Sequence, residues 1–171
     1  MYPRTGMDGV PSLEYKPRLV DPVDVAVLGH DLLSAIHAGE LVVMEGSTIP
    51  YASIPTREVA TYTGLWDVIH TVKGGLCVPH YIGVIATEEE YELPTHRDNR
   101  SHGIVKGVML IGSADLVEGE GNGTKVQTMT PGGVFTVHNE RVPEEERVLH
   151  GVNPITVPRV TLLLSWADIL L

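Results

Sequence analysis

The chain has 171 residues and a mass of 18.6 kDa, the size of a single domain with a substantial core. Acidic residues outnumber basic ones 22 to 12, and the resulting net charge of −10 disfavours non-specific binding to nucleic acid. The one cysteine, Cys77, excludes an internal disulfide framework, fits a reducing compartment and is expected in the core. No apolar run reaches the roughly 18 residues of a membrane span, so the sequence predicts a cytoplasmic protein without a membrane partner.

The first part of the chain predicts helices that support a core. Residues 1–21 contain three prolines and are expected to form an irregular arm or a lead-in strand. Residues 22–38 begin with a proline, repeat apolar residues at helical spacing and are followed by Gly39, which together predict a packing helix. A short strand is expected at 41–44, and a second helix, with Thr56 as its N-cap, is expected at 56–73.

Beyond residue 75 the sequence predicts strands. The segments there are short, β-rich and separated by Gly, Pro or charged residues, as in a sandwich or barrel. Helices followed by strands favour an α+β fold over an alternating parallel sheet. The expected strands are 76–86, 91–96, 104–111, 125–129, 133–138, 148–150 and 159–166.

One short stretch and one distant histidine suggest metal chemistry. In the extended segment His96-Arg97-Asp98, the first and third side chains point to the same face. His150 lies 54 residues beyond His96, in a later predicted strand. Two imidazoles and one carboxylate, with coordination positions left open, are the ligand set of a non-haem Fe(II) oxygenase. We therefore expect His96, Asp98 and His150 to bind a metal and to form the catalytic centre.

A second candidate group opens the last predicted strand. Arg159 begins an apolar run, and a charged residue there needs a partner because a buried unpaired charge is costly. The planar guanidinium fits a carboxylate in two-point fashion. Thr161 points the same way and adds a hydroxyl. The interior of the barrel is therefore expected to hold a carboxylate clamp beside the metal.

Together these motifs resemble those of the Fe(II)- and 2-oxoglutarate-dependent dioxygenases. Residues 130–137 are similar to the family's turn and strand before the second histidine, and residues 150–155 are similar to its "HGV-x-P" ending. The resemblance covers about residues 76–166. It implies an α+β domain over 1–171, with a double-stranded β-helix (jelly-roll) core at 76–166 and flanking N-terminal helices in a supporting segment, 1–75.

The resemblance also implies the co-substrates. Fe(II) would be held by the two histidines and the aspartate, and O₂ would be the oxidant. Arg159 and Thr161 would bind 2-oxoglutarate, and Tyr81 would donate to its carboxylate, with core packing as the alternative for this tyrosine. The products would be succinate, CO₂ and a hydroxylated substrate.

The candidates for substrate contact follow the metal motif and are Asn99, Arg100 and His102. The alternative is that they occupy ordinary loop positions. Residues 48–63, with Tyr51, Arg57, Tyr62 and Thr63, are the longest candidate lid. The short chain and its acidic surface favour a small soluble substrate such as an amino acid. The sequence does not define an oligomeric state.

Two other functions stay open. The tripeptide His96-Arg97-Asp98 is similar to the "HRD" of nucleobase oxidases of the TET/J-binding type, although the net charge disfavours duplex DNA. A cupin-like metal-binding barrel without oxygenase activity is the other alternative, because fold alone does not fix function. Arg159 discriminates against the cupin, which has no need of a carboxylate clamp at this spacing.

Overall fold

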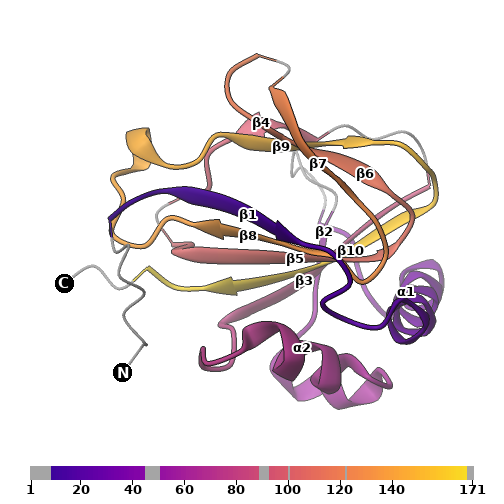
Figure 1. Ribbon diagram of the computed structural model, residues 1–171. Helices are drawn as coiled ribbons and strands as arrows, with labels where there is room; N and C mark the ends of the chain where they lie inside the picture. Colours follow the sequence, from indigo (N-terminus) through magenta and orange to yellow (C-terminus); the bar gives the residue numbers. More distant parts are fainter. Residues whose placement is uncertain (1–8, 45–50, 89–92, 100, 122, 169–171) are drawn as a thin grey trace.

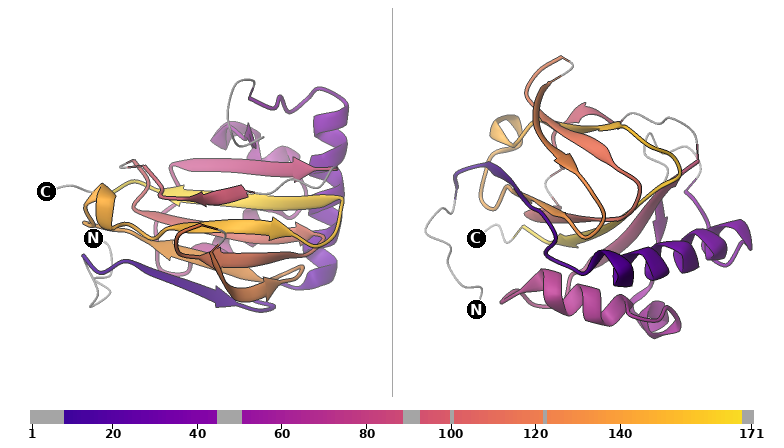
Figure 2. Two further views of the ribbon diagram at one scale, coloured as in Figure 1. Left: turned by 90° about the horizontal axis from the view of Figure 1, so that it is seen from above. Right: turned by 45° about the vertical axis from the view of Figure 1, so that its right-hand side comes forward.

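The computed structural model describes residues 9–44, 51–88, 93–99, 101–121 and 123–168. These residues form two antiparallel β-sheets that face each other, with two α-helices covering the outer side of the larger sheet (Figures 1 and 2). The predicted α+β class, with a jelly-roll core and flanking N-terminal helices, is confirmed.

Non-local pairing builds both sheets. The six-stranded sheet contains, in spatial order, β1 (Ser12–Lys16), β8 (Val134–His138), β5 (Ile104–Ile111), β10 (Arg159–Trp166), β3 (Tyr81–Thr87) and β2 (Tyr51–Ser53). The four-stranded sheet contains β4 (Leu93–His96), β9 (His150–Pro154), β6 (Ala114–Glu118) and β7 (Thr124–Met129). Because β1 and β2 belong to the larger sheet, the supporting segment 1–75 supplies strands as well as helices.

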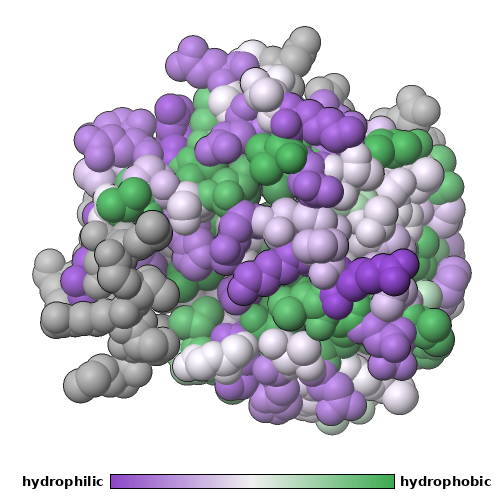
Figure 3. Space-filling model, in the orientation of Figure 1, coloured by the Kyte–Doolittle hydropathy of each residue, from purple (hydrophilic) through white to green (hydrophobic). Residues whose placement is uncertain are grey.

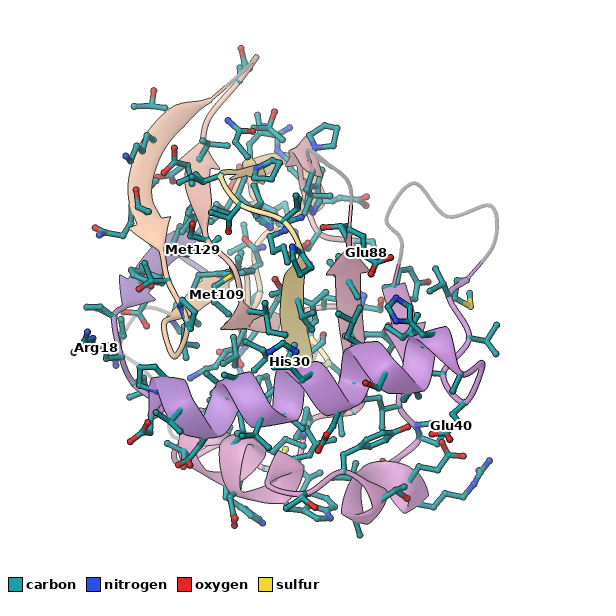
Figure 4. The ribbon with its side chains drawn as sticks, turned by 90° about the vertical axis from the view of Figure 1, so that its right-hand side faces the viewer. Arg18, His30, Glu40, Glu88, Met109 and Met129 are labelled. Carbon is teal, nitrogen blue, oxygen red and sulfur yellow. The ribbon has the colours of Figure 1, made fainter. Side chains whose placement is uncertain are left out.

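The central strand β10 shows how the sheet divides core from site. Successive side chains of a strand point to opposite faces. Val160, Leu162, Leu164 and Trp166 are fully buried in the core beneath the helices. The intervening Arg159, Thr161, Leu163 and Ser165 line a cavity between the two sheets. Figure 4 shows Met109 and Met129, which pack in a second core cluster, close together in that inter-sheet region.

The helix α1 (Pro22–His37) crosses the strands of the larger sheet (Figures 2 and 4). The Asp21 carboxylate accepts a hydrogen bond from the Val23 amide at 2.8 Å, and Pro22 occupies the first turn, where its missing N–H costs nothing. Gly39 has a φ of 74° and follows the last turn. The predicted helix 22–38 is therefore confirmed almost to the residue.

Gly29 is the point of closest approach between α1 and the sheet. A Cβ atom at this position would lie 2.7 Å from Ile111 Cγ1 and 2.9 Å from Leu110 Cβ. We therefore expect Gly29→Ala to lower the free energy of unfolding by about 1–3 kcal/mol, the usual effect of overpacking, although alanine favours helices. Chemical denaturation measures the change, and the exposed Ser34→Ala on the same helix is the control. Equal stability of Gly29→Ala and wild type would contradict this packing.

The predicted helix 56–73 is wrong as a single element. Thr56–Thr61 forms a 3₁₀ helix, η1, and the α-helix α2 runs only over Leu65–Lys73. The extended backbone of Tyr62 ends η1, and Gly64, with a left-handed φ of 84°, precedes the first turn of α2. Thr56 is not an N-cap, because Pro55 precedes η1 without a side-chain cap.

Several predicted strands shift. The strand expected at 41–44 is replaced by one isolated bridge between Val43 and Ala52, and pairing continues in β2. The strand expected at 76–86 begins only at Tyr81, and β9 extends past the predicted 148–150. Residues 91 and 92 of another predicted strand lie outside the described residues. The strand β6 was not predicted, although a conspicuous Gly-rich acidic turn follows it.

The surface carries mixed polarity. On the face drawn in Figure 3, hydrophilic residues spread over both sheets, and the hydrophobic ones form separate small groups. Cys77 is exposed, so the expectation that it belongs to the core is wrong. Among the described residues, no helix combines the length and the apolar composition needed to cross a bilayer.

Candidate active site

Adjacent strands bring two histidines together. His96 ends β4 and His150 opens β9, and the antiparallel register pairs the two residues directly. Their ring centroids are 4.6 Å apart. Asp98 follows two residues after His96, and its Oδ1 lies 3.4 Å from His96 Nε2 and 3.8 Å from His150 Nε2. One potential ligand atom of each residue lies within 4.8 Å of the others, so the three predicted metal ligands converge.

Backbone carbonyls orient both imidazoles. His96 Nδ1 donates to the Pro94 carbonyl at 2.9 Å, and His150 Nδ1 donates to the Val148 carbonyl at 3.2 Å. A carbonyl oxygen only accepts, so each neutral ring carries its proton on Nδ1 and turns an Nε2 lone pair toward Asp98. Two lone pairs facing a carboxylate repel unless a cation lies between them. This is the arrangement in which protein backbone fixes the tautomer of a metal-binding histidine.

The protonation states suit a metal. Burial would raise the pKa of Asp98, but its hydrogen bond with His96 and its electrostatic interactions with the neighbouring histidines hold that pKa below its usual value. Burial lowers the pKa of His150 despite the Asp98 charge. Burial also acts to lower the pKa of His96, but bonding to Asp98 and to the Pro94 carbonyl raises it overall. At neutral pH the site therefore offers a carboxylate and a neutral His150.

One carboxylate oxygen of Asp98 indicates whether a cation fits between the three side chains. Asp98 Oδ2 is buried and accepts no hydrogen bond from the described residues. A buried polar atom of this kind is costly unless something binds it. Because two imidazole nitrogens lie beside the same carboxylate, a divalent transition metal fits the group.

The predicted metal ligands His96, Asp98 and His150 lie in a cavity of about 390 Å³ between the sheets. Its walls combine apolar side chains with a few polar groups, the usual composition of a small-molecule site. The residues that line it are Tyr51, Tyr81, Ile85, Leu93, His96, Arg97, Asp98, Asn99, His102, Val105, Met129, Phe135, His150, Val152, Arg159, Thr161, Leu163 and Ser165.

The structure places Arg159 and Thr161 where the sequence predicted, on the inner face of β10. Arg159 is 3% exposed and lines the same cavity as the metal-binding candidates. The Thr161 hydroxyl donates to Met109 Sδ at 3.4 Å, a weak acceptor that a carboxylate oxygen would replace. A buried guanidinium and a hydroxyl on one wall can bind an anion that extends from the metal.

Tyr81 lies across the inner face of β3. Its ring covers Gly83, where any Cβ would lie 2.5 Å from the phenol oxygen, and that oxygen accepts a hydrogen bond from Ser53 at 3.4 Å. Tyr51 packs edge-on against the ring, with centroids 6.1 Å apart. Burial raises the pKa of Tyr81, so the phenol keeps its proton at neutral pH and can donate to a bound carboxylate.

The substrate candidates are placed differently. Asn99 and His102 line the cavity, whereas Arg100 lies outside the described residues. The Asn99 side chain accepts from the Ser101 amide at 3.0 Å, which fixes the loop. His102 is hydrogen-bonded to the Ser165 hydroxyl, and burial lowers its pKa, so this imidazole is neutral at pH 7.

The expected lid divides in two. Residues 48–50 lie outside the described residues, and Tyr62 is 8% exposed in the helical core, so it does not face a substrate. Tyr51 does line the cavity, whereas Arg57 and Thr63 do not. Arg97 also lines the cavity and was not among the predicted site residues, although its place between two candidate ligands was a usable signal.

Solved structures resemble this one over nearly the whole chain. A prolyl-4-hydroxylase from Pseudomonas putida has a TM-score of 0.60 at 14% identity, covering 92% of this chain and 94% of that one. A viral collagen prolyl hydroxylase from Paramecium bursaria Chlorella virus-1, in complex with 2-oxoglutarate, has a TM-score of 0.59 at 12% identity over 90% and 93%. The epimerase SnoN from nogalamycin biosynthesis, in complex with Fe³⁺, 2-oxoglutarate (alpha-ketoglutarate) and nogalamycin RO, has a TM-score of 0.60 at 12% identity over 96% and 81%.

The chain has the fold of the Fe(II)- and 2-oxoglutarate-dependent dioxygenases. The resemblance inferred from the sequence motifs is thereby confirmed for the dioxygenase fold, in which this chain carries a convergent His-Asp-His group. No family model and no curated protein matches the sequence. The likeness to these proteins is therefore one of structure.

Proposed function

We propose that this protein is a Fe(II)- and 2-oxoglutarate-dependent dioxygenase that hydroxylates a small soluble substrate such as an amino acid. The observation that carries the proposal is a single cavity that holds both a His-Asp-His group and a buried arginine. The arginine favours the dioxygenase over a cupin-like barrel without oxygenase activity, because metal binding alone needs no such cation.

His96, Asp98 and His150 would hold Fe(II) on one side, which leaves positions open toward the cavity. When bound, Fe(II) and 2-oxoglutarate together activate O₂, and one oxygen atom enters a substrate C–H bond while 2-oxoglutarate becomes succinate and CO₂. The chain's own residues then position the reactants. The apolar walls, such as Leu93 and Phe135, exclude water from the reacting groups.

Arg159 would pair with the carboxylate of 2-oxoglutarate that is distal to the metal. Thr161 would donate its hydroxyl proton to the same carboxylate, giving up the weak bond to Met109. Tyr81, with its phenol protonated, would add a third donor. Because these donors hold the distal carboxylate, they fix the orientation of 2-oxoglutarate in the cavity.

The charges of the cavity favour an anionic substrate. Among the described residues that line it, Asp98 is the one carboxylate, and Arg97 and Arg159 are the cations. With Fe(II) and the 2-oxoglutarate dianion added, the described lining residues carry an excess of one positive charge. A carboxylate at Arg97, next to the metal ligands, would neutralise that excess. This supports a small carboxylate such as an amino acid, and the net charge of −10 separately disfavours duplex DNA.

Succinate release from 2-oxoglutarate tests the proposal. The Fe(II)-loaded protein is incubated with free amino acids in one panel and with nucleosides and oligonucleotides in another. We expect stimulation by members of the first panel and a product that contains one oxygen atom from isotopically labelled O₂. Stimulation by oligonucleotides alone would instead favour a nucleobase oxidase. A product of unchanged mass would favour an epimerase, the activity named for the similar SnoN.

Arg97→Gln should weaken the binding of a carboxylate substrate about ten- to hundredfold, because a hydrogen bond to a charged group contributes about 1.5–3 kcal/mol. The measurement is the KM of the amino acid identified above. The Kd for 2-oxoglutarate is measured beside it, because Arg97 Nε also donates to the Arg147 carbonyl, and it should change less than the KM. The exposed Arg57→Gln is the matched control. If the uncharged amide of the substrate loses as much affinity as the acid, Arg97 does not bind the carboxylate.

A further inference from the structure

A buried arginine lies behind the loop that carries Asp98. The Arg147 side chain is 1% exposed, and its guanidinium donates in four directions. Nε donates to the Val142 carbonyl at 3.1 Å, and Nη1 donates to the carbonyls of Asn99 at 2.6 Å and His102 at 2.7 Å. Nη2 pairs with the fully buried Asp168 carboxylate. The site described above uses none of these groups.

The contacts of Arg147 hold the chain on both sides of Asp98. The Arg147 carbonyl accepts a hydrogen bond from Arg97 Nε at 3.2 Å, one residue before Asp98. The Arg147 side chain holds the carbonyls one and four residues after it. Residue 147 therefore fixes the loop on both sides of the aspartate.

The same residue lies close in the chain to His150, a second metal-ligand candidate. His150 follows Arg147 by three residues, and the Val148 between them is tied by its amide to Asn139 Oδ1 at 3.0 Å. The Val148 carbonyl in turn accepts from His150 Nδ1. One continuous set of hydrogen bonds thus joins the Asp98 loop to the start of β9.

The loop needs such support because no strand holds it. β4 ends at His96 and β5 begins at Ile104, and Asp98 lies in neither. Lysine could not replace Arg147, since its compact ammonium cannot reach three carbonyls and a carboxylate that surround a planar fork. Removing either partner of the buried pair would leave the other charge without compensation.

We propose that Arg147, held by Asp168, is a positioning residue that keeps Asp98 in reach of His96 and His150 for metal binding. The inference rests on the proposed function, because it requires that the three residues bind a metal. It assigns a role to the buried ion pair that is distinct from stability alone. Arg147 acts through the loop and touches neither the metal nor the substrate.

The test is Co(II) binding to the metal-free full chain, followed by absorption spectroscopy below the unfolding midpoint of every variant. We expect Asp168→Asn and Arg147→Lys to raise the Kd for Co(II) about ten- to hundredfold, the usual effect of losing an outer partner of a metal site. Asp115→Asn, which breaks a partly exposed ion pair with Lys125 on the outer strand pair, should leave the Kd unchanged. Circular dichroism verifies that each variant is folded.

A purely structural role would lower the Tm and leave the Co(II) affinity of the folded protein intact, and that result would overturn the inference. Failure of the wild type to bind Co(II) would overturn the proposed function instead, and this inference with it. Hydrogen exchange of the wild type gives a measurement without substitution. The amides of His102 and Gly103 should exchange as slowly as those of β5, and fast exchange would show that the loop is not held.

Discussion

Asp98→Asn should lower the affinity of the protein for Fe(II), Mn(II) or Co(II) by more than about 100-fold, beyond the 10- to 100-fold typical of outer-partner changes. The substitution keeps the shape of the side chain but removes the negative charge that two Nε2 lone pairs face at 3.4 and 3.8 Å. Titration of the metal-free protein with Co(II) measures the effect. Succinate release should be lost in parallel.

Asp115→Asn is the matched control, because it removes an equivalent carboxylate that pairs with Lys125 away from the cavity. Its metal affinity should equal that of the wild type. A second check is the number of metal ions bound at saturation, which should be one. Unchanged affinity in Asp98→Asn would show that the metal is held elsewhere, and the proposed catalytic centre would be wrong.

Arg159→Gln should weaken 2-oxoglutarate binding by about 30-fold or more, because truncating one partner of a buried charge pair costs about 2–5 kcal/mol. Arg159 is 3% exposed, so water cannot replace the lost partner of the co-substrate carboxylate. Calorimetry with the Mn(II)-loaded protein measures the Kd without turnover. Arg159→Lys should restore part of the affinity, since it returns the charge without the planar fork.

A shorter 2-oxo acid separates this effect from general damage. 2-Oxobutyrate has the metal-binding end of 2-oxoglutarate but no distal carboxylate, so wild type and Arg159→Gln should bind it equally weakly. If Arg159→Gln loses affinity for both acids alike, the guanidinium supports the cavity and does not contact the distal carboxylate. The exposed Arg57→Gln should match the wild type with either ligand.

The parts of the site that follow from local periodicity could be predicted from the sequence. The shared face of His96 and Asp98 depends only on alternation along an extended segment. The same alternation places Arg159 and Thr161 on one side of β10. His150 was predicted from the residue types of a metal site and not from its position, because its pairing with His96 depends on the register of two strands far apart in the chain.

Arg147 could not be predicted, for a definite physical reason. Apart from Asp168 its partners are backbone carbonyls, and a carbonyl leaves no trace in the sequence. The interruption between η1 and α2 was hidden in a similar way. Gly64 is compatible with a continuous amphipathic helix, and only its left-handed φ of 84° shows that the chain turns there.

The place of β10 in the larger sheet has a consequence for folding. Although β10 is the last strand of the described chain, it pairs with β3 on one side and β5 on the other. During synthesis β3 and β5 are made before β10, so the edge of each strand that pairs with β10 is unpaired until then. Unpaired strand edges promote aggregation. Such distant pairings also slow folding. The cavity wall that carries Arg159 is therefore completed only after β3 and β5 have been made, so the proposed co-substrate site forms only when the sheet closes.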